Sequence, residues 1–110
     1  AAKNIFKVFF LDDMIVGYYI ALLASDECQI LNIAIKKCQQ NKGLGHYLIN
    51  HVKDLSKSLY VASIFLEVRV SNIKAIKLYE KNGFNELGVR NNYYKTLNGT
   101  ENGILMGLEL

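Results

Sequence analysis

The 110-residue chain contains no proline and only two cysteines, and it has no internal repeat, low-complexity segment or linker. Its longest uninterrupted apolar run is far too short to span a bilayer, and no signal peptide opens the sequence. Cys28 and Cys38 lack metal-ligand spacing and form no Cys-x-x-Cys pair. These absences argue against a membrane-spanning or disulfide-stapled protein, and they predict reduced thiols in a cytoplasmic location.

Strong charge of one sign is also missing. Thirteen Lys and Arg against ten Asp and Glu give a net charge of +3, and the lysines are scattered along the sequence, so no nucleic-acid surface is predicted. His46 and His51 are five residues apart in a helical pattern, which places them on different faces and argues against a metal site. A hydrophobic content of 51% predicts one folded domain, residues 1–110.

What is present is a regular succession of strand and helix patterns. Asp12-Asp13 and the stretch Ser25-Asp26-Glu27 supply turns, and Asn82-Gly83 is a helix stop. The expected strands cover residues 5–11, 14–23, 28–35, 61–70, 84–94 and 103–110, and the expected helices cover 43–58 and the segment from 73 to the stop. A strand, helix and strand in succession imply one parallel pair. The pattern therefore predicts an α/β fold whose mixed sheet is mostly antiparallel.

A glycine-rich turn, Gln40-Asn41-Lys42-Gly43-Leu44-Gly45, separates an apolar strand from a helix. Glycines let a backbone approach a ligand closely, and the first amides of a helix have no partner within the helix. Because the helix dipole adds positive potential at the same place, such a turn can hold phosphate. A Gly-x-Gly turn alone is weak evidence, since it also serves as a plain helix cap.

Further motifs follow this turn in a fixed order. They are Gln-x-x-Gly-x-Gly at the turn, Leu66-Glu67-Val68-Arg69, Asn72-x-x-Ala75-x-x-x-Tyr79 and Asn82-Gly83-Phe84. Together they resemble the GNAT superfamily of N-acetyltransferases. The endings Arg90-x-x-Tyr93-Tyr94 and Ile104-Leu105-Met106 look like the RimI-type acetyltransferases, which modify the α-amine of ribosomal and related proteins with acetyl-coenzyme A (acetyl-CoA). The resemblance spans nearly the whole chain, from about Asn4 to Leu110.

The resemblance implies a GNAT fold with one splayed parallel strand pair and flanking helices. It implies that acetyl-CoA is bound by Ile33, Ala34, Ile35, Gln40, Asn41, Lys42, Gly43, Leu44, Gly45, His46 and Asn72. The main chain of residues 33–35 would pair with the pantetheine arm as an added strand. The amides of residues 41–46 would surround the pyrophosphate. Ile33 and Ile35 could also be core residues, and Asn72 could equally be a helix cap. Neither role excludes contact with the cofactor.

Two residues match the catalytic pair of the family. Glu67 interrupts an apolar strand, where a buried carboxylate needs a partner. From the residues alone it either pairs with Arg69, two positions away on the same strand face, or does chemistry. The resemblance makes Glu67 the general base that acts on the amine, and Tyr79 the acid that protonates the leaving thiolate. The alternative for Tyr79 is an aromatic side chain packed on the sheet.

The acceptor is less well specified by the motifs. Tyr93 and Tyr94 match residues that help to form a peptide groove, although a cross-strand aromatic pair would look the same. The resemblance also implies a strand and two helices ahead of the first residue, and Asn41 stands where the family often has arginine. We therefore expect a protein N-terminal acetyltransferase. The alternatives are transfer to a small amine or a lysine, and an acetyl-CoA-binding module without turnover.

Overall fold

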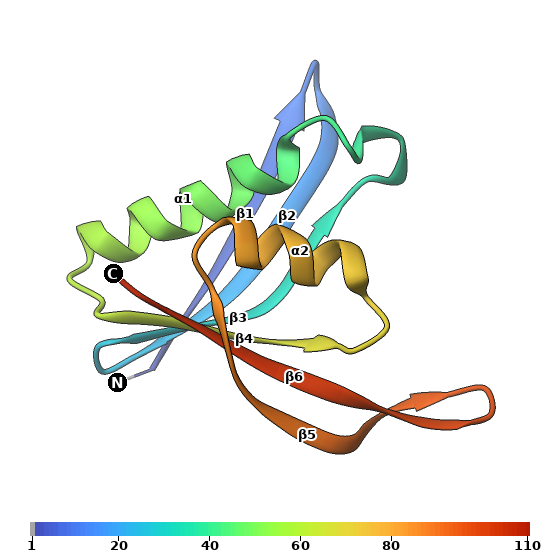
Figure 1. Ribbon diagram of the computed structural model, residues 1–110. Helices are drawn as coiled ribbons and strands as arrows, with labels where there is room; N and C mark the ends of the chain where they lie inside the picture. Colours follow the sequence, from blue (N-terminus) through green and yellow to red (C-terminus); the bar gives the residue numbers. More distant parts are fainter. Residues whose placement is uncertain (1) are drawn as a thin grey trace.

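The computed structural model describes residues 2–110, so the first residue of the predicted 1–110 domain lies outside the described part. Its strands form one sheet in the order β1-β2-β3-β4-β6-β5, and the helices α1 and α2 cover one face of that sheet (Figure 1). The predicted α/β class with a mixed, mostly antiparallel sheet is confirmed. No helix within residues 2–110 is long and apolar enough to cross a membrane.

The first three strands form the predicted antiparallel meander. They are β1 (Lys3–Leu11), β2 (Met14–Ala24) and β3 (Glu27–Ile35). Asp12 and Asp13 both have positive φ, 50° and 67°, which is the backbone that a two-residue hairpin turn requires and that aspartate tolerates. The turn residues read from the sequence therefore set the register of this half of the sheet.

The pairing of β1 with β2 contains a bulge. Phe9 pairs with Gly17, whereas Phe10 pairs with Ile15, so Val16 is the extra residue in β2. Gly17 has a different task. A Cβ at this position would lie 3.0 Å from the Ala34 carbonyl oxygen and 3.5 Å from a Leu48 methyl group of the overlying helix. A side chain at Gly17 would therefore crowd the neighbouring strand β3 first, whereas its distance to the helix would be an ordinary contact.

The parallel pair is splayed, as predicted. A 3-10 turn (Lys37–Gln39) and α1 (Leu44–Ser58) connect β3 to β4 (Ser63–Arg69). Only the first four residues of β3, Glu27–Ile30, are in register with β4. Beyond them, residues 31–35 have no strand partner on that edge within the described chain. The far half of β4 pairs with β6 alone, so the sheet opens between β3 and β4.

The C-terminal half closes the sheet with α2 (Ile73–Lys81) and a long hairpin of β5 (Asn85–Thr96) and β6 (Gly99–Glu109). The hairpin projects beyond the other strands (Figure 1). It is longer than predicted, because β5 continues past Tyr94 and only Leu97 and Asn98 connect it to β6. Gly99, with a positive φ of 147°, follows this two-residue connection as the first residue of β6.

The two faces of the sheet differ. On the helix face, Ile64, Leu66 and Val68 of β4 are buried beneath α1 and α2. The alternate residues of β4, Phe65, Glu67 and Arg69, belong to the open face. The most deeply buried large side chains are Tyr19, Leu48, Ile49, Val52, Ile64 and Met106. Ile73, in the first turn of α2, is 54% exposed, whereas Tyr79 near the end of the same helix is buried.

Candidate functional site

No side chain caps the N-terminus of α1. Gly43 is the N-cap, with φ of 80°, and neither a side-chain cap nor an acidic residue of the first turn satisfies the helix amides. The first bond of the helix runs from the Tyr47 amide to the Gly43 carbonyl, 3.1 Å. Asn41 also has a positive φ, 63°, so the turn contains two residues in the left-handed backbone conformation, Asn41 and Gly43. A concave set of free amides at a helix N-terminus binds anions.

The two glycines of the turn do different work. A Cβ at Gly43 would meet nothing within 4 Å, so this glycine is required by its positive φ and not by space within the chain. A Cβ at Gly45 would lie 2.8 Å from a Leu78 methyl group and 3.3 Å from that of Ile35. Gly45 therefore lets α1 approach α2 and β3, a packing role that the phosphate-binding interpretation of the sequence did not include.

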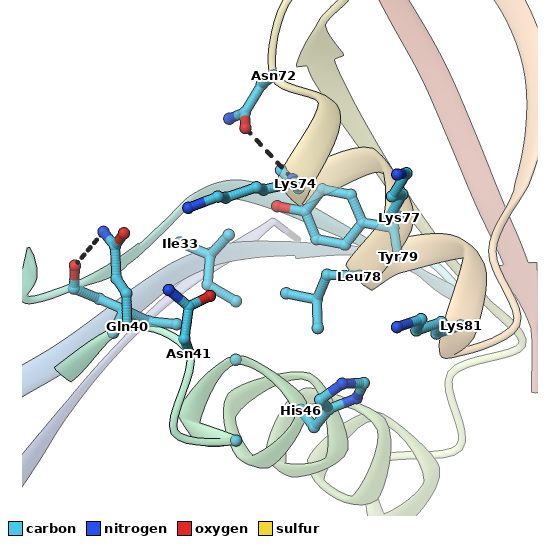
Figure 2. A pocket seen from close by; sticks show the side chains of 14 residues that line it. Ile33, Gln40, Asn41, His46, Asn72, Lys74, Lys77, Leu78, Tyr79 and Lys81 are labelled. Carbon is cyan, nitrogen blue, oxygen red and sulfur yellow. Dashed lines mark hydrogen bonds between the residues drawn. The ribbon is translucent and has the colours of Figure 1, made fainter.

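A cavity of about 580 Å³ lies beside the free amides, between the turn, β3 and α2 (Figure 2). Among the predicted cofactor-binding residues, those lining it are Ile33, Ile35, Gln40, Asn41, Gly43, Gly45, His46 and Asn72. Ala34 does not line it. Lys42 and Leu44 line a second cavity of about 470 Å³, together with residues of the β1–β2 hairpin. The structure thus gathers most of the predicted set at one place.

Three lysines of α2, Lys74, Lys77 and Lys81, also line the first cavity (Figure 2). None of the lining residues is acidic, so the charged side chains around the cavity are all cationic. The scattered-lysine interpretation of the sequence missed this group. The signal was the spacing of three and four residues, which puts lysines on one face of a helix.

Side-chain hydrogen bonds tie the turn to its neighbours. Gln40 donates from Nε2 to the Ile35 carbonyl, 3.2 Å, which anchors the turn to the end of β3. Asn72 accepts at Oδ1 from the Ala75 amide, 3.3 Å, and so caps α2, as one of its two interpretations predicted. Its contact with a cofactor stays a prediction. His46 Nδ1 lies 2.9 Å from Asn82 Nδ2 and joins the start of α1 to the end of α2.

Tyr79 lies on the helix face at the wall of the cavity. Its ring packs against Phe84 with centroids 5.9 Å apart, and the residue is only 6% exposed. The hydroxyl group points into the cavity (Figure 2). Burial disfavours the phenolate and raises the pKa of Tyr79 to about 12. The packing role and a proton-donating role therefore coexist in this side chain.

Glu67 lies on the opposite, open face, and its predicted alternative partner is wrong. The carboxylate pairs with Arg90, with 3.2 Å between Oε2 and Nε, and not with Arg69. Arg69 instead pairs with Glu101, 3.3 Å from Nη1 to Oε2. Glu67 and Arg69 project from the same face of β4, so each can find a partner on another strand. Arg90 of β5 pairs with Glu67, and Glu101 of β6 pairs with Arg69.

The predicted acceptor residues also lie on the open face. The rings of Tyr93 and Tyr94 meet edge to face at 4.9 Å. Arg69 lies 4.5 Å over the Tyr94 ring and Arg90 lies 4.2 Å over the Tyr93 ring. Burial, and then the nearby Glu67 carboxylate, raise the pKa of Tyr94. The aromatic pair and its arginines form one cluster around Glu67.

A second carboxylate, Glu101, completes this cluster. The Ser71 amide donates to Glu101 Oε1 at 3.0 Å, and hydrogen bonding by Ser71 lowers the pKa of Glu101, with a smaller effect from Arg69. Within residues 2–110, no three His, Cys, Asp or Glu side chains are grouped so as to hold a metal ion. The chemistry of the cluster is therefore that of carboxylates, guanidinium groups and phenols.

The candidate site has two compartments, one on each face of the sheet. The cavity with the free amides, the lysines and Tyr79 is on the helix face, and Glu67 with the aromatic pair is on the open face. The gap between β3 and β4 lies between them. A molecule that fills this gap from the helix face would present its end to Glu67.

Comparison with known proteins agrees with these features. A family model described as Acetyltransferase (GNAT) family matches residues 2–84. The [Ribosomal protein bS18]-alanine N-acetyltransferase of Salmonella typhimurium is 41% identical over 99 residues, covering 90% of this chain and 67% of the relative. This chain therefore spans about two thirds of the length of that relative.

Solved structures agree in fold as well. A crystal structure of the ribosomal-protein-alanine N-acetyltransferase from Escherichia coli superimposes with a TM-score of 0.92 at 38% identity, covering 96% of this chain and 68% of that one. A GNAT family acetyltransferase from Elizabethkingia anophelis with acetyl-CoA bound has a TM-score of 0.87 at 25% identity, with coverages of 96% and 75%. The two resemblances predicted from the motifs are confirmed.

Proposed function

We propose, from the premise that this chain belongs to the Acetyltransferase (GNAT) family, that it transfers an acetyl group from acetyl-CoA to the α-amine of a protein. Because relatives are named as alanine N-acetyltransferases of a ribosomal protein, our proposal takes the N-terminus of a ribosomal protein as the acceptor. We place the reaction in the cytoplasm, where the two free cysteines would remain reduced, and assign it to one domain formed by the whole chain.

The observation that carries the proposal is the uncapped N-terminus of α1, which opens into a cavity with three lysines and no acidic side chain. Acetyl-CoA fits this arrangement, because its pyrophosphate needs amide donors and its total charge is strongly negative. The open edge of β3 beyond Ile30 offers unpaired backbone groups to a pantetheine arm. A relative with acetyl-CoA bound shares the fold.

Acetyl-CoA would supply the acetyl group in an activated form, as a thioester. Glu67 would accept a proton from the acceptor ammonium, through a water molecule, so that the amine nitrogen can form the new bond to the acetyl carbon. Tyr79 would donate its proton to the sulfur as the carbon–sulfur bond breaks. A pKa of about 12 keeps the Tyr79 phenol protonated at any physiological pH, as an acid requires. Neither residue forms a covalent bond with the acetyl group.

The open face would hold the acceptor. Tyr93 and Tyr94 provide a pair of aromatic surfaces close to Glu67, and they would contact the first residues of an extended peptide. A peptide backbone gives such a groove much to hold, whereas a small amine gives it little. The groove therefore favours a protein N-terminus over a free amine.

The experiment is to measure thiol release from acetyl-CoA with matched acceptor peptides. One peptide begins with a free alanine, and its control has a blocked N-terminus and a single internal lysine. We expect faster release with the free alanine. Equal rates with the two peptides would favour lysine or small-amine acetylation, and tight binding of acetyl-CoA without release on any acceptor would favour a non-catalytic binding module.

A further inference from the structure

The Glu67 carboxylate is held from one side by a single cation. Arg90 Nε lies 3.2 Å from Glu67 Oε2, and the Glu67 side chain is only 17% exposed, whereas that of Arg90 is 57% exposed. Within residues 2–110 no other Lys, Arg or His forms an ion pair with Glu67. Arg69, the nearest cation on the same strand, pairs with Glu101 instead. The orientation of the carboxylate therefore depends on Arg90.

The contact crosses an entire strand. Glu67 is on β4 and Arg90 is on β5, with β6 between them. Gly103 of β6 is in register with both Arg69 and Arg90, and it has no side chain to separate the two outer strands. A Cβ at Gly103 would lie 3.4 Å from both Cγ and Oε2 of Glu67, and 3.0 Å from the Tyr94 ring. A side chain at Gly103 would therefore crowd the Tyr94 ring and the Glu67 carboxylate.

Arg90 also touches the predicted acceptor groove. Its guanidinium carbon lies 4.2 Å from the centre of the Tyr93 ring, a distance at which a cation and an aromatic face attract. Because a guanidinium group is planar and carries its charge over the whole plane, it can lie over a ring and form an ion pair with a carboxylate at once. One side chain therefore couples the position of the base to that of the groove.

We propose that Arg90 is a positioning residue for the reaction: it fixes Oε2 of Glu67, which leaves Oε1 directed to accept the proton of the acceptor amine. The inference rests on the proposed function, in which Glu67 is the base. Arg90 takes no proton and touches no reacting atom. Its effect is on the geometry of a proton transfer, where a small displacement of the base lowers the rate strongly.

The test is steady-state kinetics with acetyl-CoA and the alanine peptide for a set of variants. We expect Arg90→Ala to lower kcat by roughly tenfold, the scale of a displaced catalytic group, with the KM for acetyl-CoA unchanged. Arg90→Lys should recover part of the loss, because a cation is restored without the fork geometry. The matched control is Lys95→Ala, which removes an exposed cation from the same strand, β5, outside both of the ion pairs of the cluster, and should keep kcat within about twofold.

A double variant separates positioning from general stability. If Arg90 acts through Glu67, Arg90→Ala combined with Glu67→Gln should be no slower than Glu67→Gln alone. Multiplicative losses in the double variant, or wild-type kcat in Arg90→Ala, would overturn the inference while leaving the proposed function intact. Wild-type kcat in Glu67→Gln itself would instead remove the base role and the inference with it. Thermal unfolding of each variant tests whether the fold is retained. If Arg90→Ala does not fold, Arg90→Lys takes its place in the kinetic comparison.

Discussion

The two faces of the sheet carry opposite chemistry at the place where β3 and β4 part. On the helix face, the cavity has free helix amides and lysines and no acidic lining residue. On the open face, two carboxylates are each paired with an arginine and bordered by tyrosines. The helix face therefore presents only cations to a ligand, whereas the charges of the open face are balanced within its own two ion pairs. In the proposed function the two reactants would approach from these different faces and meet at the gap between β3 and β4.

The largest effect that this comparison predicts comes from the open face. Glu67→Gln keeps the shape of the side chain and removes the base, so turnover should fall by roughly 10²-fold while the affinity for acetyl-CoA stays the same. Because an α-amine titrates near pH ~8, the loss should shrink as pH rises and the acceptor arrives deprotonated. The measurement is kcat across pH with binding by calorimetry. A loss that is constant with pH and comes with weakened cofactor binding would make Glu67 a structural partner of Arg90.

A smaller effect is expected at the wall of the cavity. Tyr79→Phe keeps the packing against Phe84 and removes the proton donor, so turnover should fall by roughly 30-fold, below the ~10²-fold that a general acid typically contributes. The leaving thiol is itself fairly acidic, near pH ~8.5, which limits the loss. With the pKa of Tyr79 raised to about 12, the phenol stays protonated through an ordinary assay range. The ratio of variant to wild-type rate should therefore be flat with pH, and a ratio that varies between about pH 6 and pH 9 would contradict this role.

The mildest change should affect the helix face alone. Gly43→Val forces a branched side chain onto a residue with φ of 80° beside the free amides, and should weaken acetyl-CoA binding by roughly tenfold, about 1.4 kcal/mol. Gly99→Val is its matched control, because Gly99 also has positive φ, 147°, in open space, but lies at the tip of the distal hairpin. The control should lose stability and keep its affinity. Equal affinity for the two variants by calorimetry would remove the turn from the binding site.

Much of the fold was predictable, because its signals are local. The period of two in the strands and of three to four in the helices located the six strands and both α-helices, though not the 3-10 turn, and Asp12 and Asp13 marked a turn that needs positive φ. The ends of the hairpin were less predictable. Its length depends on cross-strand bonds such as that from Thr100 Oγ1 to Asn92 Oδ1, 2.9 Å, which no local pattern reveals.

The site shows the same limit more sharply. The free amides around Gly43 follow from a motif, so the motif was enough to predict the turn. The partner of Glu67 could not be predicted, because Arg90 is 23 residues further along the sequence and comes near it only through the register of β6 with both neighbouring strands. Sequence spacing shows which residues share a strand face, and only the strand order shows which strand lies beside it.

The short register between β3 and β4 has a consequence for amide hydrogen exchange. Residues 27–30 of β3 have partners in β4, whereas the same edge of residues 31–35 has none within the described chain. In the free protein, the amides on that edge should take up deuterium quickly, while those bonded to β2 remain protected. A molecule that lies along the edge as an added strand would protect them without moving the rest of the sheet. Deuterium uptake over residues 31–35 would therefore record when the edge is filled, before any bond is made or broken.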